Sequence, residues 1–230
     1  MRVTETEKYY RENSAELGWG PEIAKLDSER LRMLDRHVAG PKILDVACGS
    51  GIYTDYLAKR GFDAWGIDLV ADFIEKAKTT KQGTYLQGEA DRLPFADGEF
   101  DTVLLFDILE HVDDAVLLRE AKRVASKRIL VNVPRKADKA LEQRGIVFGH
   151  YVDKSHLREY TEESLRLLAL DSGVDIVCLQ GINPLKPLEI FRGTFSGNPV
   201  LKKLIKCFIT VSMKSGFYPQ GIFAVLEKRK

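Results

Sequence analysis

Residues 43–51 read Ile-Leu-Asp-Val-Ala-Cys-Gly-Ser-Gly, and this stretch decides the fold. Its apolar first half is the continuous hydrophobic run that is typical of a parallel strand buried on both faces, and Gly49 and Gly51 end the run. A strand that ends in a glycine loop and leads into a helix is a common ligand-binding turn. Asp45 stands out, because an unpaired carboxylate inside a buried strand costs about 2 to 7 kcal/mol or more. We therefore expect Asp45 to face a cationic ligand group or hydrogen-bond donors in the loop.

The glycine loop alone fits more than one interpretation. A Gly-x-Gly after a strand can be a tight turn that binds nothing. It can also begin the dinucleotide fingerprint Gly-x-Gly-x-x-Gly, but Thr54 occupies the third glycine position, which disfavours nicotinamide and flavin cofactors. About 20 residues after the loop, the short strand Ala-Trp-Gly-Ile-Asp ends in Asp68, where a ribose-binding carboxylate belongs. We expect Asp68 at a solvent-facing strand end, where it suits a nucleoside with free ribose hydroxyls.

With these residues, the sequence resembles the class I S-adenosylmethionine-dependent methyltransferases, and among them the ubiquinone and menaquinone biosynthesis group. Asp-Val-Ala-Cys-Gly-Ser-Gly matches the first motif of the family, and Gly-Ile-Asp-Leu-Val matches its second-strand acid. Two later motifs follow in order, Gly-Glu-Ala-Asp-Arg-Leu-Pro-Phe at 88–95 and Phe-Asp-Thr-Val-Leu-Leu-Phe-Asp-Ile-Leu-Glu-His-Val-Asp-Asp at 100–114. The resemblance runs from about residue 40 to 182, and an ordered set of motifs is far more specific than one glycine loop.

The resemblance implies S-adenosylmethionine as the cofactor and residues that bind it. Asp45 would order the loop and the methionyl ammonium, Asp68 would bind both ribose hydroxyls, and Glu89 with Ala90 would hold adenine. Glu89 stands where the family usually has Asp, so Asp91 is an alternative for the same contact and a solvated loop acid is the alternative for Glu89. The expected cofactor-binding residues are Asp45, Ala47, Gly49, Gly51, Asp68, Leu69, Glu89, Ala90 and Phe106.

The methyl acceptor is expected beyond the carboxyl ends of the strands, because ligands of open parallel sheets bind there. His111 is the candidate catalytic base, and fixing the start of the next helix is its alternative role. A long polar excursion to about residue 160 contains a dense polar and aromatic segment at 149–161. His150 and His156 with Asp153 form only a weak metal-binding pattern, so no metal is expected. The expected substrate-binding residues are Tyr9, Tyr10, Asp107, His150, Tyr151, His156 and Arg158, with ordinary packing as the alternative for the first two and a structural role for His156.

The chain is expected to form one methyltransferase domain with an α/β, doubly wound, mostly parallel seven-stranded sheet whose last strand is antiparallel. Its parts are an N-terminal helical cap at 1–39, a cofactor-binding core at 40–182, a helical insertion or lid at 183–220 and the last strand within 221–230. Helices are predicted over residues 3–16, 22–39, 53–60, 71–79 and 162–172. Later strands are predicted over residues 84–87, 102–106, 128–134, 174–179 and 222–227.

Composition narrows the class of protein. A hydrophobic content of 44% in 230 residues suits one globular domain, and a net charge of +1 gives no general attraction to nucleic acid, so no nucleic-acid partner is expected. The three cysteines are odd in number and widely spaced, which argues against a disulfide framework and fits a reduced compartment. The first 20 residues lack the apolar core of a secretory signal. We therefore expect a soluble, cytoplasmic protein.

Residues 200–214 form a second notable pattern. On a helical wheel the apolar residues cover one half and the lysines fall on the other. Such a helix is a lid packed on the enzyme, which favours a lipid-like or aromatic acceptor, or it contacts an anionic membrane surface or a partner. The expected reaction is methyl transfer from S-adenosylmethionine to a small or medium-sized acceptor. A nucleotide-cofactor oxidoreductase and a non-catalytic S-adenosylmethionine-binding module are the alternatives.

Overall fold

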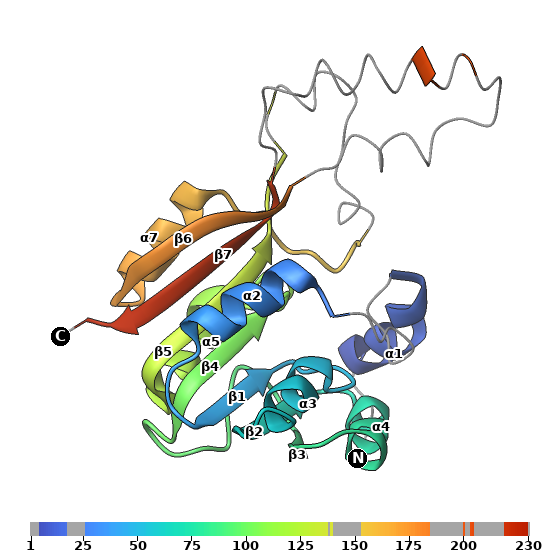
Figure 1. Ribbon diagram of the computed structural model, residues 1–230, viewed down its shortest axis with the longest axis vertical. Helices are drawn as coiled ribbons and strands as arrows, with labels where there is room; N and C mark the ends of the chain where they lie inside the picture. Colours follow the sequence, from blue (N-terminus) through green and yellow to red (C-terminus); the bar gives the residue numbers. More distant parts are fainter. Residues whose placement is uncertain are drawn as a thin grey trace.

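The computed structural model describes residues 5–17, 26–137, 139, 153–184, 200, 203, 204 and 219–229. A seven-stranded sheet forms its centre, in the order β3-β2-β1-β4-β5-β7-β6 (Figure 1). The strands are β1 (Lys42–Val46), β2 (Asp63–Asp68), β3 (Thr84–Gln87), β4 (Phe100–Phe106), β5 (Ala125–Pro134), β6 (Val174–Pro184) and β7 (Pro219–Lys228). The helices include α1 (Glu5–Leu17), α2 (Ser28–His37), α3 (Ile52–Ala58), α4 (Ala71–Thr80), α5 (Asp114–Val124) and α7 (Glu162–Asp171).

The direction of the strands confirms the predicted fold class. β3, β2, β1, β4 and β5 pair in parallel, whereas β7 is antiparallel to both of its neighbours, β5 and β6. Strand order reverses at β1, because the chain moves outward from β1 to β3 and then returns to place β4 on the other side. In open parallel sheets this reversal opens a crevice at the carboxyl ends of the strands. The crevice in this protein therefore falls beside the glycine loop that follows β1.

The continuous apolar run of β1 is explained by packing on both faces of the sheet. Leu44 and Val46 point into one core together with buried residues of α5 and α7. Ile43, which precedes Leu44 and faces the opposite side of the sheet, points into the other core, to which α2 and α3 contribute. All three side chains are fully buried. A strand covered by helices on both sides has no water-facing positions, and therefore lacks the polar alternation of a half-buried strand.

Boundaries differ from the predictions mainly where tertiary pairing extends an element. β6 continues to Pro184, five residues past the predicted end at Leu179, because β7 pairs with it along this length. α2 begins at Ser28 rather than residue 22, and Asp27 caps it by accepting hydrogen bonds from the backbone N–H groups of the first turn. α7 begins after Thr161, whose side chain caps the helix by accepting a hydrogen bond from the backbone N–H of Ser164.

Several predictions concern residues outside the described part of the chain. The amphipathic pattern at 200–214 and the insertion at 183–220 are described only at their edges and at a few positions, so their roles stay predictions. His150 and Tyr151 also lie outside the described residues. Within the part that is described, no helix combines the length and the apolar character that crossing a membrane requires.

The two glycines of the loop provide a matched test of the packing around it. Both have left-handed backbones, with φ of 54° at Gly49 and 77° at Gly51. A Cβ at Gly51 would lie 2.4 Å from Cε1 of Tyr85, whereas a Cβ at Gly49 would meet no atom within 4 Å. The same substitution therefore introduces similar backbone strain at both positions but a steric clash at only one.

We predict that Gly49→Ala lowers the free energy of unfolding by about 1 to 2 kcal/mol, the cost of a left-handed alanine. Gly51→Ala should lower it by about 2 to 5 kcal/mol, because overpacking against Tyr85 adds to that strain. Urea unfolding of the two variants without added ligands measures the difference. Equal losses of stability would contradict the packing described for Gly51.

Candidate functional site

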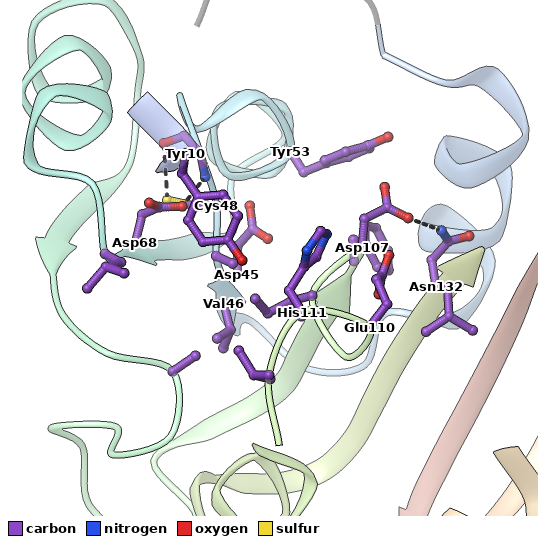
Figure 2. Close-up of a pocket in the computed structure, with 18 of the residues that line it drawn as sticks. Tyr10, Asp45, Val46, Cys48, Tyr53, Asp68, Asp107, Glu110, His111 and Asn132 are labelled. Carbon is purple, nitrogen blue, oxygen red and sulfur yellow. Dashed lines mark hydrogen bonds between the residues drawn. The ribbon is translucent and has the colours of Figure 1, made fainter. Parts of the chain in front are cut away.

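A cavity of about 930 Å³ opens at the carboxyl ends of β1, β2, β4 and β5 (Figure 2). The glycine loop and the end of β2 line one end, and the end of β4, the segment after it and α2 line the other. Predicted site residues that line it are Tyr10, Asp45, Ala47, Gly49, Asp68, Leu69, Glu89, Ala90, Phe106, Asp107, His111 and His156. The fold therefore brings most of the predicted residues to one cavity, although they come from widely separated positions in the chain.

Asp68 ties the end of β2 to the glycine loop. Its Oδ2 accepts a hydrogen bond of 2.7 Å from the backbone N–H of Gly49, and its Oδ1 accepts one of 2.9 Å from that of Val70. The residue is only 9% exposed, so the expected solvent-facing position is wrong. Burial raises the pKa of Asp68 to about 6, although the backbone donors act in the opposite direction. The carboxylate thus has a structural role in addition to any contact with a ligand.

Asp45 is more deeply buried and finds its partner in α3. The residue is 3% exposed, and its Oδ2 accepts a hydrogen bond of 2.8 Å from the hydroxyl of Thr54. Burial raises the pKa of Asp45 to about 7, against the lowering effect of the Thr54 donor. Thr54, which interrupts the dinucleotide fingerprint, is therefore the hydrogen-bond donor for the acid in the preceding strand. The threonine nine residues after the acid was the sequence signal for this pair.

The predicted adenine end of the cavity is more open. Glu89 and Asp91 are exposed and line the cavity with the half-buried Ala90 between them. Gly51 lies behind the loop, where it is the N-cap of α3 and packs against Tyr85. Both Glu89 and Asp91 are therefore available for the expected contact with adenine, so the choice between them stays open. Gly51 has a packing role.

Asp107 is the central group of the other end of the cavity. Both terminal nitrogens of Arg30 donate to its carboxylate, with Nη2 at 2.9 Å from Oδ1, and Nδ2 of Asn132 lies 2.8 Å from the same Oδ1. Asp107 also has a left-handed backbone, with φ of 53°. Arg30 and Asn132 line the cavity too. Sequence reasoning missed both, because neither belongs to a local motif.

His111 lies beside Asp107 and is held from several sides. Its Nδ1 is 2.9 Å from the hydroxyl oxygen of Ser155, and its ring makes edge contacts with the rings of Tyr10 and His156. Burial, followed by the neighbouring His156, lowers the pKa of His111 to about 4. The cap of α5 is Asp113, whose side chain accepts from the backbone of Val116, so His111 is not the residue that fixes the helix start.

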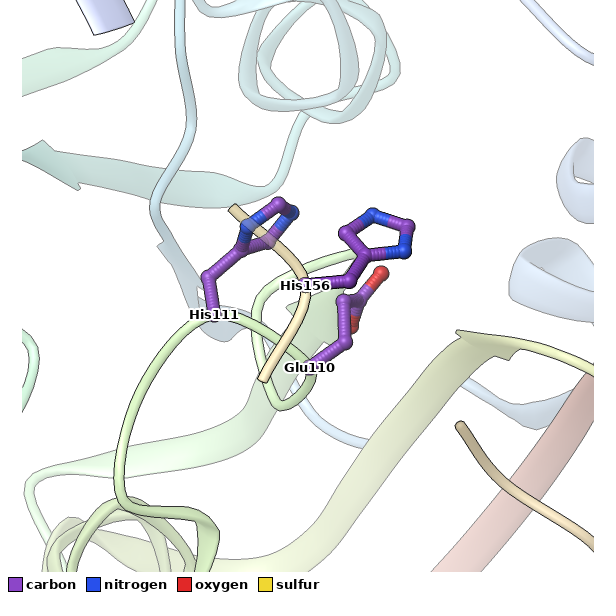
Figure 3. A group of neighbouring side chains, drawn as sticks. All are labelled: Glu110, His111 and His156. Atoms are coloured by element: carbon purple, nitrogen blue, oxygen red, sulfur yellow. The ribbon is translucent and has the colours of Figure 1, made fainter. Parts of the chain in front are cut away.

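Glu110, His111 and His156 form a compact cluster (Figure 3). One potential ligand atom from each residue lies within 4.8 Å of the others, and among the described residues Oε2 of the buried Glu110 has no hydrogen-bond partner. Burial, and then the charge of Asp107, raises the pKa of Glu110. A carboxylate and two imidazoles are donor types that bind zinc and similar ions, so the cluster has the chemistry to hold a metal. The expectation that the protein uses no metal stays a prediction.

Two predicted substrate residues support the site from outside the cavity. Tyr9 donates to Oδ1 of Asp153 over 3.4 Å. Arg158 donates from Nη1 to the backbone oxygens of Leu109, at 2.8 Å, and Val112. The guanidinium therefore holds the turn that carries His111, rather than pointing into the cavity.

A mostly parallel sheet with a cavity at the reversal of strand order defines a Rossmann-like α/β fold, a class in which nucleotide ligands bind at that crevice. Comparisons with known proteins narrow this class. Residues 44–128 match the family model described as a methyltransferase domain. The chain is 35% identical over 127 residues to a ubiquinone biosynthesis O-methyltransferase of Methylococcus capsulatus. The matched stretch covers 50% of this chain and 53% of that protein. The corresponding protein of Psychrobacter arcticus is 32% identical over 121 residues, 47% of each chain. The chain thus spans about half the length of these relatives.

Solved structures agree on the fold. A SAM-dependent methyltransferase from Archaeoglobus fulgidus superposes with a TM-score of 0.68 at 19% identity, covering 96% of this chain and 100% of that one. The magnesium protoporphyrin IX methyltransferase of Synechocystis superposes with a TM-score of 0.56 at 15% identity, covering 100% of this chain and 90% of that one. The chain therefore has the fold of these S-adenosylmethionine-dependent methyltransferases, its residues 44–128 match a methyltransferase domain, and these similarities support S-adenosylmethionine as the cofactor.

The raised pKa of Asp45 predicts how stability changes with pH. The buried acid stays protonated up to about pH 7 in the folded protein, whereas it ionises near pH 3.8 when unfolded. Asp45 therefore makes its full contribution to the free energy of unfolding below about pH 4. This contribution is lost as the pH rises to about 7, by up to about 1.4 kcal/mol per pH unit. Asp45→Asn, which keeps an oxygen for the Thr54 hydroxyl, should flatten this slope. Urea unfolding without cofactor between pH 4 and 8 measures it.

The control is Asp72→Asn on α4, an exposed acid that should leave the slope as it is in the parent. A slope that is equally steep in Asp45→Asn and the parent would mean that Asp45 ionises normally in the folded state.

Proposed function

We propose that this chain transfers the methyl group of S-adenosylmethionine to an oxygen atom of a small or medium-sized acceptor. The observation that carries the proposal is the single cavity that joins the glycine loop and Asp68 to the polar groups around Asp107 and His111. One end has the donors and acids that suit a nucleoside with an amino-acid moiety, and the other has room for a second molecule. The choice of oxygen rests on the O-methyltransferase relatives.

The residues have distinct roles in this proposal. Asp68 accepts from the ribose hydroxyls, Glu89 or Asp91 accepts from the adenine amino group, and the loop from Asp45 to Gly49 faces the methionyl moiety. The bound sulfonium supplies an electrophilic methyl group, so little acid–base chemistry is required of the protein. The chain's own contribution is to hold donor and acceptor in line, which lowers a barrier by about 7 to 11 kcal/mol in well-oriented systems.

Oxidoreductase activity is disfavoured by the position of Thr54. A dinucleotide fingerprint has glycine there for close packing between helix and strand, whereas Thr54 is fully buried and bonded to Asp45. A module that binds S-adenosylmethionine without turnover keeps the same cofactor end. The acceptor end distinguishes a methyltransferase from such a module, because a module that only binds the cofactor has no need for the network of charged and polar residues around Asp107.

The acceptor in this proposal is aromatic or lipid-like. Tyr53 and Phe106 line the acceptor end, with their ring centroids 5.3 Å apart in an edge-to-face arrangement. Such walls favour flat apolar ligands. A lid or membrane contact by residues 200–214 would suit the same class of acceptor and remains part of the proposal, as does a cytoplasmic location.

Asp68→Asn should weaken S-adenosylmethionine binding by about 10-fold or more, because a carboxylate that accepts from two hydroxyls loses charge-assisted hydrogen bonds worth about 1.5 to 3 kcal/mol each. Asparagine is preferable to alanine here, since Asp68 also holds the backbone of Gly49 and Val70. Calorimetric titration measures the affinity, and Asp97→Asn on the surface serves as the control. Affinity within twofold of the parent would rule out the ribose assignment.

His111→Ala tests the candidate base. If His111 takes a proton from the acceptor, turnover should fall about 100-fold or more while S-adenosylmethionine affinity stays unchanged. Because the pKa of His111 is about 4, the ring is neutral at pH 7 and the parent's rate should show no titration of this residue between pH 6 and 8. Formation of S-adenosylhomocysteine, followed across this range, measures both. Nearly full turnover in the variant would leave His111 with a packing role alone.

A further inference from the structure

Asp107 is a carboxylate whose hydrogen-bonding capacity is almost, but not completely, used. An ionised carboxylate has about four acceptor sites, two on each oxygen. Oδ1 accepts from Arg30 Nη2 and from Asn132 Nδ2, whereas Oδ2 accepts from Arg30 Nη1. In the described part of the chain these contacts leave one acceptor site, on Oδ2. The side chain of Asp107 is 42% exposed and lines the cavity, so a bound molecule can reach this site.

The orientation of this carboxylate is fixed before any ligand arrives. Arg30 grips both oxygens in a bidentate pair, which sets the plane of the carboxylate as well as its position. Arg30 itself is anchored by α2, whose first turn is capped by Asp27 and joined to the end of β6 by a hydrogen bond of 2.6 Å from the backbone of Asn183 to Glu29. A preorganised acceptor atom of this kind is suited to hold one donor group of a ligand in a defined direction.

The charges around Asp107 select between ligand classes. The guanidinium of Arg30 is paired with Asp107 through both terminal nitrogens, so its positive charge is balanced by that carboxylate. Asp27 and Asp153 line the same cavity and add negative charge. The acceptor end therefore repels a carboxylate and accepts a group that donates a hydrogen bond.

We propose that Asp107 is the anchor of the methyl acceptor, and that its Oδ2 accepts a hydrogen bond from a hydroxyl or amine of an uncharged aromatic molecule. Arg30 and Asn132 are positioning residues that aim this oxygen. The proposal rests on the proposed methyltransferase function, because it places the acceptor at the end of the cavity opposite the cofactor loop. Edge-to-face packing of Tyr53 and Phe106 beside Asp107 supplies the aromatic wall.

Four benzene derivatives test the donor requirement, because they share one ring and differ in one group. Phenol and aniline donate a hydrogen bond, anisole has an oxygen but no donor, and benzoate is an anion. Binding to the protein saturated with S-adenosylhomocysteine, measured by ligand-observed NMR titration, should be at least 5-fold tighter for phenol and aniline than for anisole and benzoate. Phenol that binds no tighter than anisole or benzoate would overturn the proposal.

Variants assign the effect to Asp107. Asp107→Asn should abolish the preference for phenol over anisole while S-adenosylhomocysteine affinity stays within twofold of the parent. Arg30→Lys keeps the positive charge but cannot grip both oxygens, so it should reduce the preference by severalfold without abolishing binding. Asp97→Asn, which removes an exposed acid outside the cavity, is the matched control and should leave the preference unchanged. An unchanged preference in Asp107→Asn would refute the anchor.

The measurements separate this inference from the function on which it rests. Failure of the parent protein to bind S-adenosylmethionine or S-adenosylhomocysteine contradicts the methyltransferase proposal. Cofactor binding without a preference for phenol contradicts only the role of Asp107. A phenol preference that disappears when a metal chelator is added would also overturn the direct contact, because it would place an ion at Glu110, His111 and His156 between the protein and the phenol.

Discussion

The site depends on two acids that are buried at the ends of neighbouring parallel strands. Asp45 and Asp68 each need donors, because desolvation of a carboxylate is costly, and each finds them in the segment that follows a strand. Thr54 reaches back from α3 to Asp45, and Gly49 donates its backbone N–H to Asp68. The glycine loop is therefore fixed by the acids, rather than by its own backbone preferences alone. The shape of the cofactor end follows from these contacts.

The acceptor end is built by a different principle, since its key contacts join elements that are far apart in the chain. Arg30 and Asp107 are 77 residues apart, and Asn132 comes from a third element, β5. Their network connects α2 to the carboxyl end of β4, where Asp107 has a left-handed backbone that costs an ordinary residue about 1 to 3 kcal/mol. Backbone strain of this size persists where neighbouring contacts enforce it, as the bidentate ion pair with Arg30 does at Asp107.

The two ends of the cavity are held in place by different sets of contacts. Asp45 and Asp68 bond to partners in the glycine loop, in α3 and just after β2, so a change there affects binding and stability together. Residues at the acceptor end are held by α2, by Asn132 of β5 and by the segment around Asp153, all of which lie outside the glycine loop and the first two strands. Their replacement alters the acceptor end while the loop and its acids keep their partners. The fold therefore supports different acceptors with one cofactor site.

The sequence by itself determined the sheet class, because strand and loop patterns are local, and its ordered motifs indicated the cofactor through the family that they resemble. A buried apolar run, two glycines and an acid at a fixed spacing are read within short segments, and hydrogen bonds between adjacent residues of a turn follow from them. Only the tertiary structure decided that Asp68 is buried, that Thr54 pairs with Asp45, and that Arg30 and Asn132 orient Asp107. These contacts form between segments brought together by sheet pairing and helix packing. Their energies depend on distance in space and on exclusion of water, neither of which is encoded in the spacing of residues along the chain.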